Sequence, residues 1–357
     1  MKILHIIPTL GAGGAEKLLV DTIEEMLKQG IPCDVIVLTK ENNFFGESLS
    51  QLNITLHYSS YSNVYDPRNI LFIKRIMQQG NYDCVHTHLF SAQLFTSIAN
   101  ALTKNKLPLV TTEHSTNNRR REKKIFYYLD SWMYKQYERI ISITEGAKDA
   151  LVSYLPYTEN QTIVIYNGIQ LKKFQQATTT KQLWDKLDDE VTVLMVAGMR
   201  TEKDHHTLIR ASKLLPVNYR VVFVGDGALF DEVVNYASEN GRKTILFLGA
   251  RTDVPKIMKA ADVFVLSSEW EGFGLVVVEA AAAGLPVVAS DVAGLRDVVL
   301  SINGSLFEQG SAKMLAEKII GVSIEKNKAT QQQLEKYDIT NMVSSYLKLY
   351  NDIMHFK

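Results

Sequence analysis

Short apolar runs rich in valine and isoleucine alternate with longer helical patterns along nearly the whole chain. Because these runs show little polar alternation, they are typical of parallel strands that helices cover on both faces. Strands that alternate with helices predict βαβ units and a doubly wound α/β fold. The expected strands are residues 2–7, 33–38, 54–58, 84–87, 109–112, 140–143 and 163–166, then 191–196, 220–224, 245–248, 263–266 and 287–290.

The alternation breaks once, between Gln175 and Glu190, where the sequence is polar and contains three consecutive threonines. We interpret this stretch as a linker with a short helix, which divides the 357 residues into two domains with full cores. The expected domains are residues 1–170 and 171–338. Apolar residues recur at helical spacing over 339–354, so we expect a C-terminal helix within residues 339–357 that packs back on the first domain.

Charge and cysteine content limit the partners and the compartment. The chain carries 39 basic and 39 acidic residues, which argues against nucleic acid as the main partner. Cys33 and Cys84 both fall in expected strands, which favours reduced core thiols and a cytoplasmic location. No apolar stretch approaches the ~20 residues of a membrane span, and we interpret the apolar residues 3–7 as the first strand rather than a signal peptide.

Two carboxylates, Glu271 and Glu279, stand eight positions apart around a glycine-containing turn. We expect Glu271 to precede a helix and to lie beside the free N–H groups of the helix start, where anions bind. This arrangement suits a ligand that offers hydroxyls to the acids and a phosphate to the amides. An ordinary helix with acids near its start, which the helix dipole favours, explains the spacing equally well.

A glycine-rich segment, Gly11 to Gly14, follows the first expected strand. Glycines let the backbone approach a ligand closely, and the next helix offers its N-terminus to a phosphate. Glu16 stands where a dinucleotide fingerprint has its third glycine, so we do not expect an NAD site. Contact with a phosphate is favoured over a purely structural turn.

Three histidines lie at or near expected strand ends in the first half. His114 follows a strand and can face a ligand, although a single histidine is more often structural. His86 and His88 alternate along one strand and so share a face, as two ligands of a metal would. No third Asp, Glu or Cys is close in sequence, so core packing is favoured for at least one of the pair.

Four successive strand ends in the second half carry glycine, basic or acidic residues. After the first of them, Arg200 and Lys203 can neutralise a diphosphate. No Asp-x-Asp lies at a strand end, so a metal-bridged diphosphate is not expected. The P-loop and the nucleophile elbow of hydrolases are also absent from the sequence.

In order and spacing, these motifs resemble the retaining glycosyltransferases of the GT-B fold, in the group 1 type called family 4. The resemblance covers nearly the whole chain, and its most specific part is the pair Glu271 and Glu279 followed by the segment from Gly284 to Asp291. The other segments that carry it are residues 11–16, 83–88, 113–114, 142–145, 166–168, 203–205, 225–227 and 267–270.

The resemblance implies two Rossmann-like doubly wound domains that face each other across a cleft, the first on the acceptor side and the second binding the donor. It implies transfer of a sugar, with retention and without metal or cofactor, from a UDP-, GDP- or ADP-sugar to a saccharide or a polyprenyl-diphosphate-linked acceptor. Such enzymes build cell-surface polysaccharide or glycolipid. One alternative is a nucleotide-sugar epimerase of similar architecture. The other is a non-catalytic sugar-nucleotide-binding subunit, and the presence of both glutamates argues against this second alternative.

The resemblance also implies roles for individual residues. Glu279 would bind the ribose and Glu271 the transferred sugar, while Lys203 would neutralise the diphosphate and His114 would approach the reacting carbon. The catalytic set is therefore Glu271, Lys203 and His114. Further implied contacts are the backbone of Gly272, Phe273, Gly274 and Leu275 with sugar and phosphate, Phe247, Gly249 and Arg251 with the nucleobase, and Gly13 and Gly14 with the acceptor or the diphosphate.

One position departs from the family pattern. The family usually has an arginine five residues before the lysine, where this chain has Gly198. Either Arg200 substitutes for that arginine or one phosphate contact is absent.

A basic and aromatic stretch runs from Arg119 to Tyr134 and opens with three consecutive arginines. Such a mixture suits the anionic inner face of the cytoplasmic membrane, where the protein would be peripheral, or a lipid-diphosphate acceptor. The alternative is a solvated loop followed by a helix whose aromatic side chains pack inside.

Overall fold

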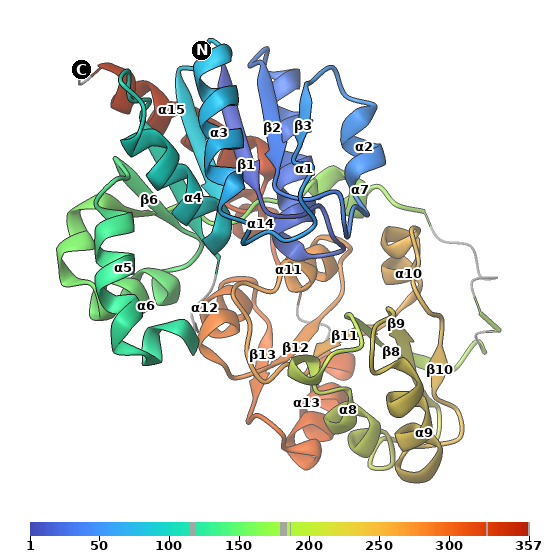
Figure 1. Cartoon of the computed structure of the whole chain (residues 1–357). Coiled ribbons are helices and arrows are strands. Elements are labelled where there is room, and N and C mark those ends of the chain that lie inside the picture. The colour runs from blue at the N-terminus through green and yellow to red at the C-terminus, as the bar shows by residue number, and fades with distance from the viewer. Residues whose placement is uncertain (115–118, 179–183, 186, 326–327, 356–357) are drawn as a thin grey trace. The chain divides into compact units, whose positions relative to one another are not determined.

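The computed structural model describes residues 1–114, 119–178, 184–185, 187–325 and 328–355. Two compact units result, one of Met1–Gly168 with Ile339–Lys357 and one of Ile169–Asp338 (Figure 1). Within the expected linker, residues 179–183 and 186 lie outside the described residues. A short helix, α7 (Leu171–Gln175), ends where the expected linker begins, and the other described residues of the linker contain no helix.

The first unit contains a parallel sheet of seven strands in the order β3-β2-β1-β4-β5-β6-β7. The strand order reverses between β1 and β4, and ligands of open α/β sheets bind outside the carboxyl ends of strands at such a switch point. The strands are β1 (Ile3–Ile7), β2 (Cys33–Val37), β3 (Leu56–Tyr58), β4 (Cys84–His88), β5 (Leu109–Glu113), β6 (Arg139–Ser142) and β7 (Thr162–Val164).

Helices cover both faces of this sheet. On one face, Leu4, Ile6 and Val85 pack into an apolar core with side chains of α3 to α6. On the other face, Ile7 and Val35 pack against α1. The helices of this unit are α1 (Gly14–Lys28), α2 (Gly46–Ser50), α3 (Arg68–Gln79), α4 (Phe90–Ala101), α5 (Lys124–Tyr134), α6 (Glu145–Tyr154) and α15 (Ile339–His355).

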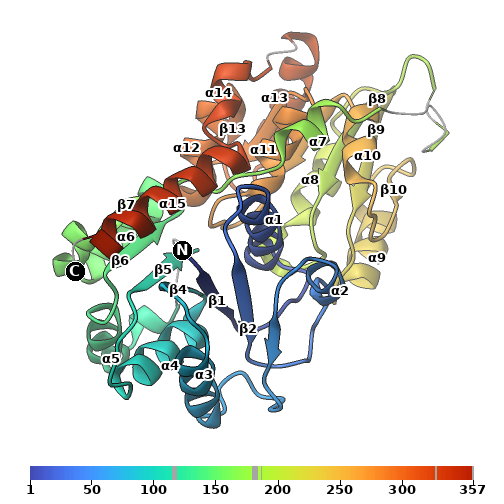
Figure 2. The ribbon, with the colours of Figure 1, turned by 90° about the horizontal axis from the view of Figure 1, so that it is seen from above.

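The C-terminal helix α15 returns to the first unit and lies beside α1 (Figure 2). It covers a layer of buried histidines on β1 and β4, where His5 pairs in register with His86. The Tyr350 hydroxyl lies 2.6 Å from Nδ1 of His86, and the Tyr346 ring meets the His86 ring edge-on at 5.3 Å. The helix is thus attached to the sheet by a buried polar contact as well as by apolar packing.

The second unit contains a parallel sheet of six strands in the order β10-β9-β8-β11-β12-β13, with its switch point between β8 and β11. Its strands are β8 (Val191–Val196), β9 (Tyr219–Val224), β10 (Leu246–Phe247), β11 (Val263–Leu266), β12 (Val287–Ser290) and β13 (Ser305–Phe307). Its helices after α7 are α8 (His205–Ser212), α9 (Phe230–Asn240), α10 (Val254–Ala260), α11 (Leu275–Ala282), α12 (Ala293–Ser301), α13 (Ala312–Glu325) and α14 (Gln331–Glu335).

Two doubly wound parallel sheets confirm the fold class predicted from the sequence. The twelve expected strands all form, with ends that differ by a residue or two. The edge strand β13 was not predicted, because its three residues are too short to show a pattern. Among the described residues, no helix has the length and apolar character that a membrane crossing requires.

Removing one hydroxyl tests the attachment of α15. We expect Tyr350→Phe to lower the free energy of unfolding by about 1–3 kcal/mol, because Nδ1 of buried His86 loses its partner. Tyr128→Phe is the matched control, since that side chain is 75% exposed, and it should have almost no effect. Urea unfolding of both variants measures this; equal stabilities would contradict the assigned contact.

The buried imidazoles make the stability of the first unit depend on pH. Desolvation lowers the pKa of His5 to about 3 and that of His114 to about 4, and it holds the pKa values of His86 and His88 well below 6.5. The unfolded chain therefore binds protons below pH ~6.5 that the folded protein does not bind. The stabilisation is complete above that pH and is lost as the pH falls toward the folded-state values.

As the pH falls from roughly 6 to 4, we therefore expect each of these histidines to lower the free energy of unfolding by about 1.4 kcal/mol per pH unit. Denaturant titrations at a series of pH values measure the slope. A free energy of unfolding that stays constant over this window would show that the imidazoles are protonated inside the fold.

Candidate functional site

A lysine and a glutamate meet at the switch point of the second unit. Lys203 lies in the turn after β8, and Glu271 lies in the loop after β11. Their side chains form a hydrogen-bonded ion pair in which the lysine is 21% and the glutamate 12% exposed. The Ser268 hydroxyl donates to the same carboxylate oxygen at 2.9 Å. This edge of the sheet therefore holds a desolvated charged pair where a ligand is expected to bind.

The turn that carries Lys203 is held in a strained conformation. Asp204 has φ 42°, a left-handed backbone conformation that residues other than glycine rarely adopt. Its carboxylate caps α8 by accepting from the backbone N–H of Thr207 at 3.1 Å, and its carbonyl accepts from the Ser267 hydroxyl at 2.8 Å. Strained residues concentrate at functional sites. Here the hydrogen bond from Ser267 to Asp204 holds the Lys203 turn against the loop after β11.

Glycines bring the start of α11 and the Glu271 loop close together. Gly274 has φ 74°, and a Cβ there would lie 2.3 Å from Leu295. A Cβ on Gly294 would lie 1.8 Å from the carbonyl oxygen of Glu271. Gly274, the N-cap residue of α11, has no side chain that could cap the helix. The N-terminus of α11, the end at which helices bind anions, therefore lies beside the charged pair.

The other acid of the motif has a different environment. Glu279 lies in the second turn of α11 and is only 7% exposed. Phe273 is buried and meets the Tyr337 ring edge-on at 5.7 Å, so its side chain anchors the loop and leaves its backbone for ligand contact. Glu271 precedes the helix, as the sequence predicts.

Arg200 stands at the start of the Lys203 turn and is exposed. Its Nε lies 3.6 Å from the point that a Cβ on Gly198 would occupy. The arginine side chain therefore runs beside the Gly198 backbone, where the family usually has its arginine. Arg251, by contrast, forms a two-point ion pair with Asp253 at 2.8 Å. Phe247, expected beside a nucleobase, stacks on Phe223 at 5.1 Å between ring centroids, and Gly249 adopts φ 63°.

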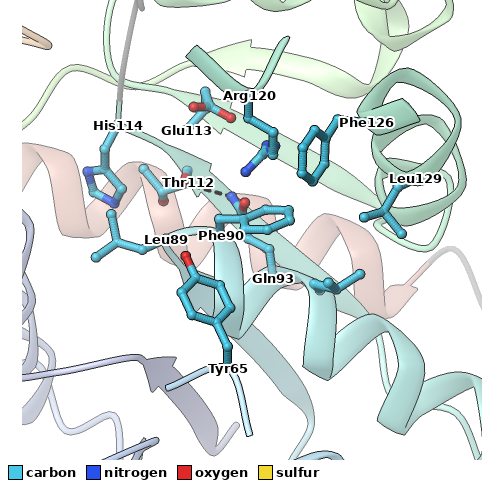
Figure 3. A pocket seen from close by; sticks show the side chains of 11 residues that line it. Tyr65, Leu89, Phe90, Gln93, Thr112, Glu113, His114, Arg120, Phe126 and Leu129 are labelled. Atoms are coloured by element: carbon cyan, nitrogen blue, oxygen red, sulfur yellow. Dashed lines mark hydrogen bonds between the residues drawn. The ribbon is translucent and has the colours of Figure 1, made fainter. Parts of the chain in front are cut away.

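The first unit contains a cavity of about 610 Å³ at the carboxyl ends of β4 and β5 (Figure 3). Its wall is mainly apolar, with His114, Arg120 and Gln93 among its polar groups. Leu89, which lines it, has φ 66°, a second strained residue beside a strand end. The remaining lining residues are Tyr65, Phe90, Leu94, Thr112, Glu113, Phe126 and Leu129.

His114 is linked to the histidine layer. Its Nε2 lies 3.4 Å from Nδ1 of His88, whose Nε2 lies 3.2 Å from Nδ1 of His5. Sequence reasoning missed His5, because it precedes His88 by 83 residues and only the pairing of β1 with β4 brings them together. Its position in the first strand is the one signal that could have pointed to it.

Nitrogens of His5, His86 and His88 lie within 4.8 Å of one another, as ligands of a metal ion can. However, both ring nitrogens of His86 already have partners, the Tyr350 hydroxyl at 2.6 Å and the Thr112 hydroxyl at 2.7 Å. Both His86 and His88 are buried in the core. The contacts of His86 agree with the favoured interpretation of core packing for at least one of this pair.

The glycine loop after β1 ends at Gly13, which precedes α1. The Glu16 carboxylate folds over it, so that a Cβ on Gly13 would lie 2.2 Å from Oε2. The Thr9 hydroxyl donates to Oε1 of Glu16 at 3.2 Å. Glu16 therefore replaces the third glycine of a dinucleotide site with an acid at the helix start. The contact of Gly13 and Gly14 with a ligand stays a prediction.

In the basic and aromatic stretch, two arginines face inward while several large side chains of α5 face solvent. Arg120 pairs with buried Asp130 at 3.2 Å, and Arg121 pairs with Glu113 at 3.1 Å. Both arginine side chains are about 90% buried, so they do not form a basic surface, and the Arg119 side chain lies outside the described residues. Nor do the aromatics of α5 pack inside as a group. Four large side chains of α5 are exposed, namely Ile125 at 74%, Tyr127 at 41%, Tyr128 at 75% and Trp132 at 40%.

Comparison with known proteins shows which family the chain belongs to. Residues 177–340 match "Glycosyl transferases group 1", and residues 12–173 match "Glycosyltransferase Family 4". An Escherichia coli relative, UDP-Gal:alpha-D-GlcNAc-diphosphoundecaprenol alpha-1,3-galactosyltransferase, is 27% identical over 314 residues, which cover 82% of this chain and 81% of that protein. An uncharacterized glycosyltransferase of Methanocaldococcus jannaschii is 30% identical over 257 residues, 69% of this chain and 67% of the relative.

Among solved structures, the Anabaena protein HepE in complex with UDP and glucose superimposes with a TM-score of 0.85 at 22% identity, covering 99% of this chain and all of that one. At this identity the likeness shows the fold, which is the GT-B arrangement of two Rossmann-like domains predicted from the sequence. The family is shown by the two family matches, which follow each other along the chain, and by the relative that is 30% identical. The chain belongs to the group 1 glycosyltransferases of family 4.

Proposed function

We propose that this glycosyltransferase moves a sugar, with retention of configuration, from a nucleotide-diphosphate sugar to a saccharide carried on a lipid diphosphate. The observation that carries the proposal is the Lys203–Glu271 pair beside the start of α11, which a glycine precedes. Its position at the switch point is the one at which open α/β sheets bind nucleotides. The name of the E. coli relative, which acts on a diphosphoundecaprenol-linked sugar with UDP-galactose, supports both substrate classes.

Donor binding follows from the chemistry of this edge. The amides at the start of α11 and the Lys203 ammonium bind the diphosphate, because both provide positive charge to an anion. Glu279 accepts hydrogen bonds from the ribose hydroxyls, and Glu271 accepts them from the transferred sugar. Arg200 supplies a further phosphate contact in place of the arginine missing at Gly198, since its side chain already runs along that backbone.

The reaction breaks the bond between the sugar C1 and the β-phosphate oxygen and forms a bond from C1 to the acceptor oxygen. The leaving phosphate oxygen takes the acceptor's proton on the same face, so configuration is retained and no protein nucleophile is needed. Lys203 and the helix amides stabilise the negative charge that develops on the diphosphate, in positions fixed before the reaction. Glu271 orients the sugar and stabilises its developing positive charge, and the site needs no metal ion.

The acceptor binds to the first unit under this proposal. The cavity beside His114 is mainly apolar yet contains Arg120, whose guanidinium lies 3.5 Å over the Phe90 ring. The proposal assigns His114, which lines this cavity, to the transferred sugar. Because the charge of Arg120 is paired with Asp130, it is the mainly apolar wall that suits a lipid-linked saccharide.

Product analysis tests the transfer and separates it from the alternatives. A synthetic prenyl-diphosphate saccharide and a panel of nucleotide sugars should yield a product in which the new linkage has the anomeric configuration of the donor. Proton NMR of the linkage gives the configuration. An inverted product would overturn the retaining mechanism. Conversion of a nucleotide sugar without any acceptor would favour an epimerase, and binding without turnover would favour a non-catalytic subunit.

Replacing each glutamate by glutamine should affect a different constant, donor affinity for Glu279 and kcat for Glu271. We expect Glu279→Gln to weaken donor affinity about 10- to 100-fold, since a hydrogen bond to a charged group contributes about 1.5–3 kcal/mol. Glu271→Gln should lower kcat more than donor affinity, because its charge acts most strongly in the transition state. Calorimetric donor titration and steady-state kinetics measure the split.

The matched control for the glutamate variants is Glu269→Gln, which makes the same chemical change at an exposed position of the same loop and should leave both constants close to those of the native chain. Equal losses of affinity and turnover in Glu271→Gln and Glu279→Gln would undo the division of roles.

We further propose that α5 rests on an anionic lipid surface, where a lipid-linked acceptor resides. Ile125, Tyr128 and Trp132 project from this helix into solvent, at spacings that place them on one side. Lys123 and Lys124 are exposed at its start. Apolar and aromatic side chains flanked by lysines match the boundary between acyl chains and anionic headgroups. The buried arginines hold the helix in place instead of contacting lipid.

Vesicle sedimentation tests this surface. We expect Tyr128→Ser combined with Trp132→Ser to lower binding to anionic vesicles at least about tenfold, since each buried aromatic contributes well over 1 kcal/mol. Lys123→Gln with Lys124→Gln should reduce binding only when the lipids are anionic. Leu71→Ser, at an exposed position of α3, is the control. Unchanged binding in both double variants would show that α5 does not contact the bilayer.

A further inference from the structure

Three imidazoles form a chain that runs from the core of the first unit to its cavity. His5 on β1 contacts His88 on β4 at 3.2 Å, and His88 contacts His114 after β5 at 3.4 Å. In each contact a Nδ1 atom faces a Nε2 atom. At the outer end, His114 lines the cavity (Figure 3). Because Nε2 of His114 faces His88, Nδ1 is the nitrogen left for a ligand.

The three rings cannot choose their tautomers independently. Burial holds the pKa values of all three below 6.5, so each ring is neutral near pH 7 and carries a single N–H. A ring that donates to one neighbour must therefore accept from the other. Only two arrangements complete both hydrogen bonds, one with every proton on Nδ1 and one with every proton on Nε2. Fixing the tautomer of His5 fixes that of His114.

The inner end of the chain distinguishes these arrangements. Among the described residues, Nε2 of His5 is buried without a hydrogen-bond partner. With every proton on Nε2, that atom would be a buried N–H with no acceptor, which is rare in folded proteins. With every proton on Nδ1, it is only an unused acceptor, a less unfavourable state. His86 does not enter the chain, because the Thr112 and Tyr350 hydroxyls occupy its two nitrogens.

We infer that His5 and His88 are positioning residues that hold His114 as its Nδ1–H tautomer, so that His114 presents a hydrogen-bond donor, not a base, to the ligand in the cavity. The identity of that ligand as the transferred sugar rests on the proposed function, whereas the tautomer does not. A donor N–H suits a sugar hydroxyl oxygen, and a ring without a free lone pair cannot take the acceptor's proton. The proton then goes to the leaving phosphate.

Nitrogen NMR of the native chain tests the inference directly. With 15N-labelled histidine, protonated and unprotonated ring nitrogens are distinguished by their chemical shifts and by their couplings to the ring carbon-bound protons. We expect His5, His88 and His114 all to carry the proton on Nδ1 at pH 7. Protons on Nε2, or unequal tautomers along the chain, would overturn the inference. This outcome is independent of any transfer activity, so it also stands if the proposed function fails.

Metal content is measured on the same sample, because a metal ion held by His5, His86 and His88 would use the nitrogens that the chain needs. We expect less than stoichiometric zinc, copper, nickel, iron, manganese and cobalt in protein purified without chelators. The contradicting result is one equivalent of any of these metals that a chelator removes, with a simultaneous change in the histidine signals. The three histidines would then be a metal site and not a chain of tautomers.

Kinetics of His88 variants provide a second readout. In His88→Gln, the amide can accept from His5 and donate to His114, so the direction of the chain is kept. In His88→Met, both hydrogen bonds are lost at similar volume. We expect His88→Met to lower kcat about tenfold, with little change in the KM for donor, whereas His88→Gln retains most of the turnover. Equal losses in the two variants would indicate a merely structural role.

A double-mutant cycle separates action through His114 from any other effect of His88. In a His114→Ala background, His88→Met should lower kcat no further, because the ring that it positions is gone. The same factor in both backgrounds would contradict the inference. Circular dichroism and unfolding midpoints identify any variant that fails to fold, and the NMR result on the native chain decides the question in that case.

Discussion

The ion pair between Lys203 and Glu271 is the interaction around which the strand-end loops of the second unit are arranged. Burying two charges is unfavourable unless each keeps good partners, and here Ser268 supplies a further hydrogen bond to the carboxylate. The loops reach this geometry only because Asp204 accepts a left-handed backbone and Gly294 leaves room for the Glu271 carbonyl. An arrangement that stores strain and charge at a strand edge is more easily explained by binding than by stability.

The same logic applies in the first unit, with neutral groups in place of charged ones. His5, His86 and His88 occupy core positions that apolar residues would fill more favourably. Their nitrogens are satisfied mainly by one another and by hydroxyls, including that of Tyr350 on the returning C-terminal helix. A polar layer of this kind fixes the orientation of its members, and it ends at the cavity that His114 lines.

The fold could be predicted because it depends on short-range patterns. Valine-rich runs and the spacing of glycines and acids locate the parallel strands and their carboxyl ends, and parallel pairing then gathers those ends at one edge of each sheet. Lys203 and Glu271 both follow such strands, and the resemblance to family 4 is what assigned them to one ligand. The chain of histidines could not be predicted, because it depends on the register of β1 against β4.

The arginines near residue 120 show another limit of sequence reasoning. A run of basic residues beside aromatics indicates an exposed surface, yet Arg120 and Arg121 turn inward to Asp130 and Glu113. Only the folded structure reveals this, since the partners lie ten residues (Asp130) and eight residues (Glu113) away along the chain. The exposure of the aromatic side chains of α5 could not be predicted from the helical pattern either, because apolar residues occur on more than one side of this helix.

The central claim is that the switch point of the second unit binds a nucleotide-diphosphate sugar through Lys203. Thermal unfolding of the native chain with UDP-, GDP- and ADP-sugars tests it most directly, because a ligand at 100 times its Kd stabilises the folded form by about 2.7 kcal/mol. One nucleotide class should raise the unfolding temperature, and Lys203→Met should abolish most of the rise. Stabilisation that survives Lys203→Met unchanged, or no stabilisation by any nucleotide sugar, would contradict the account.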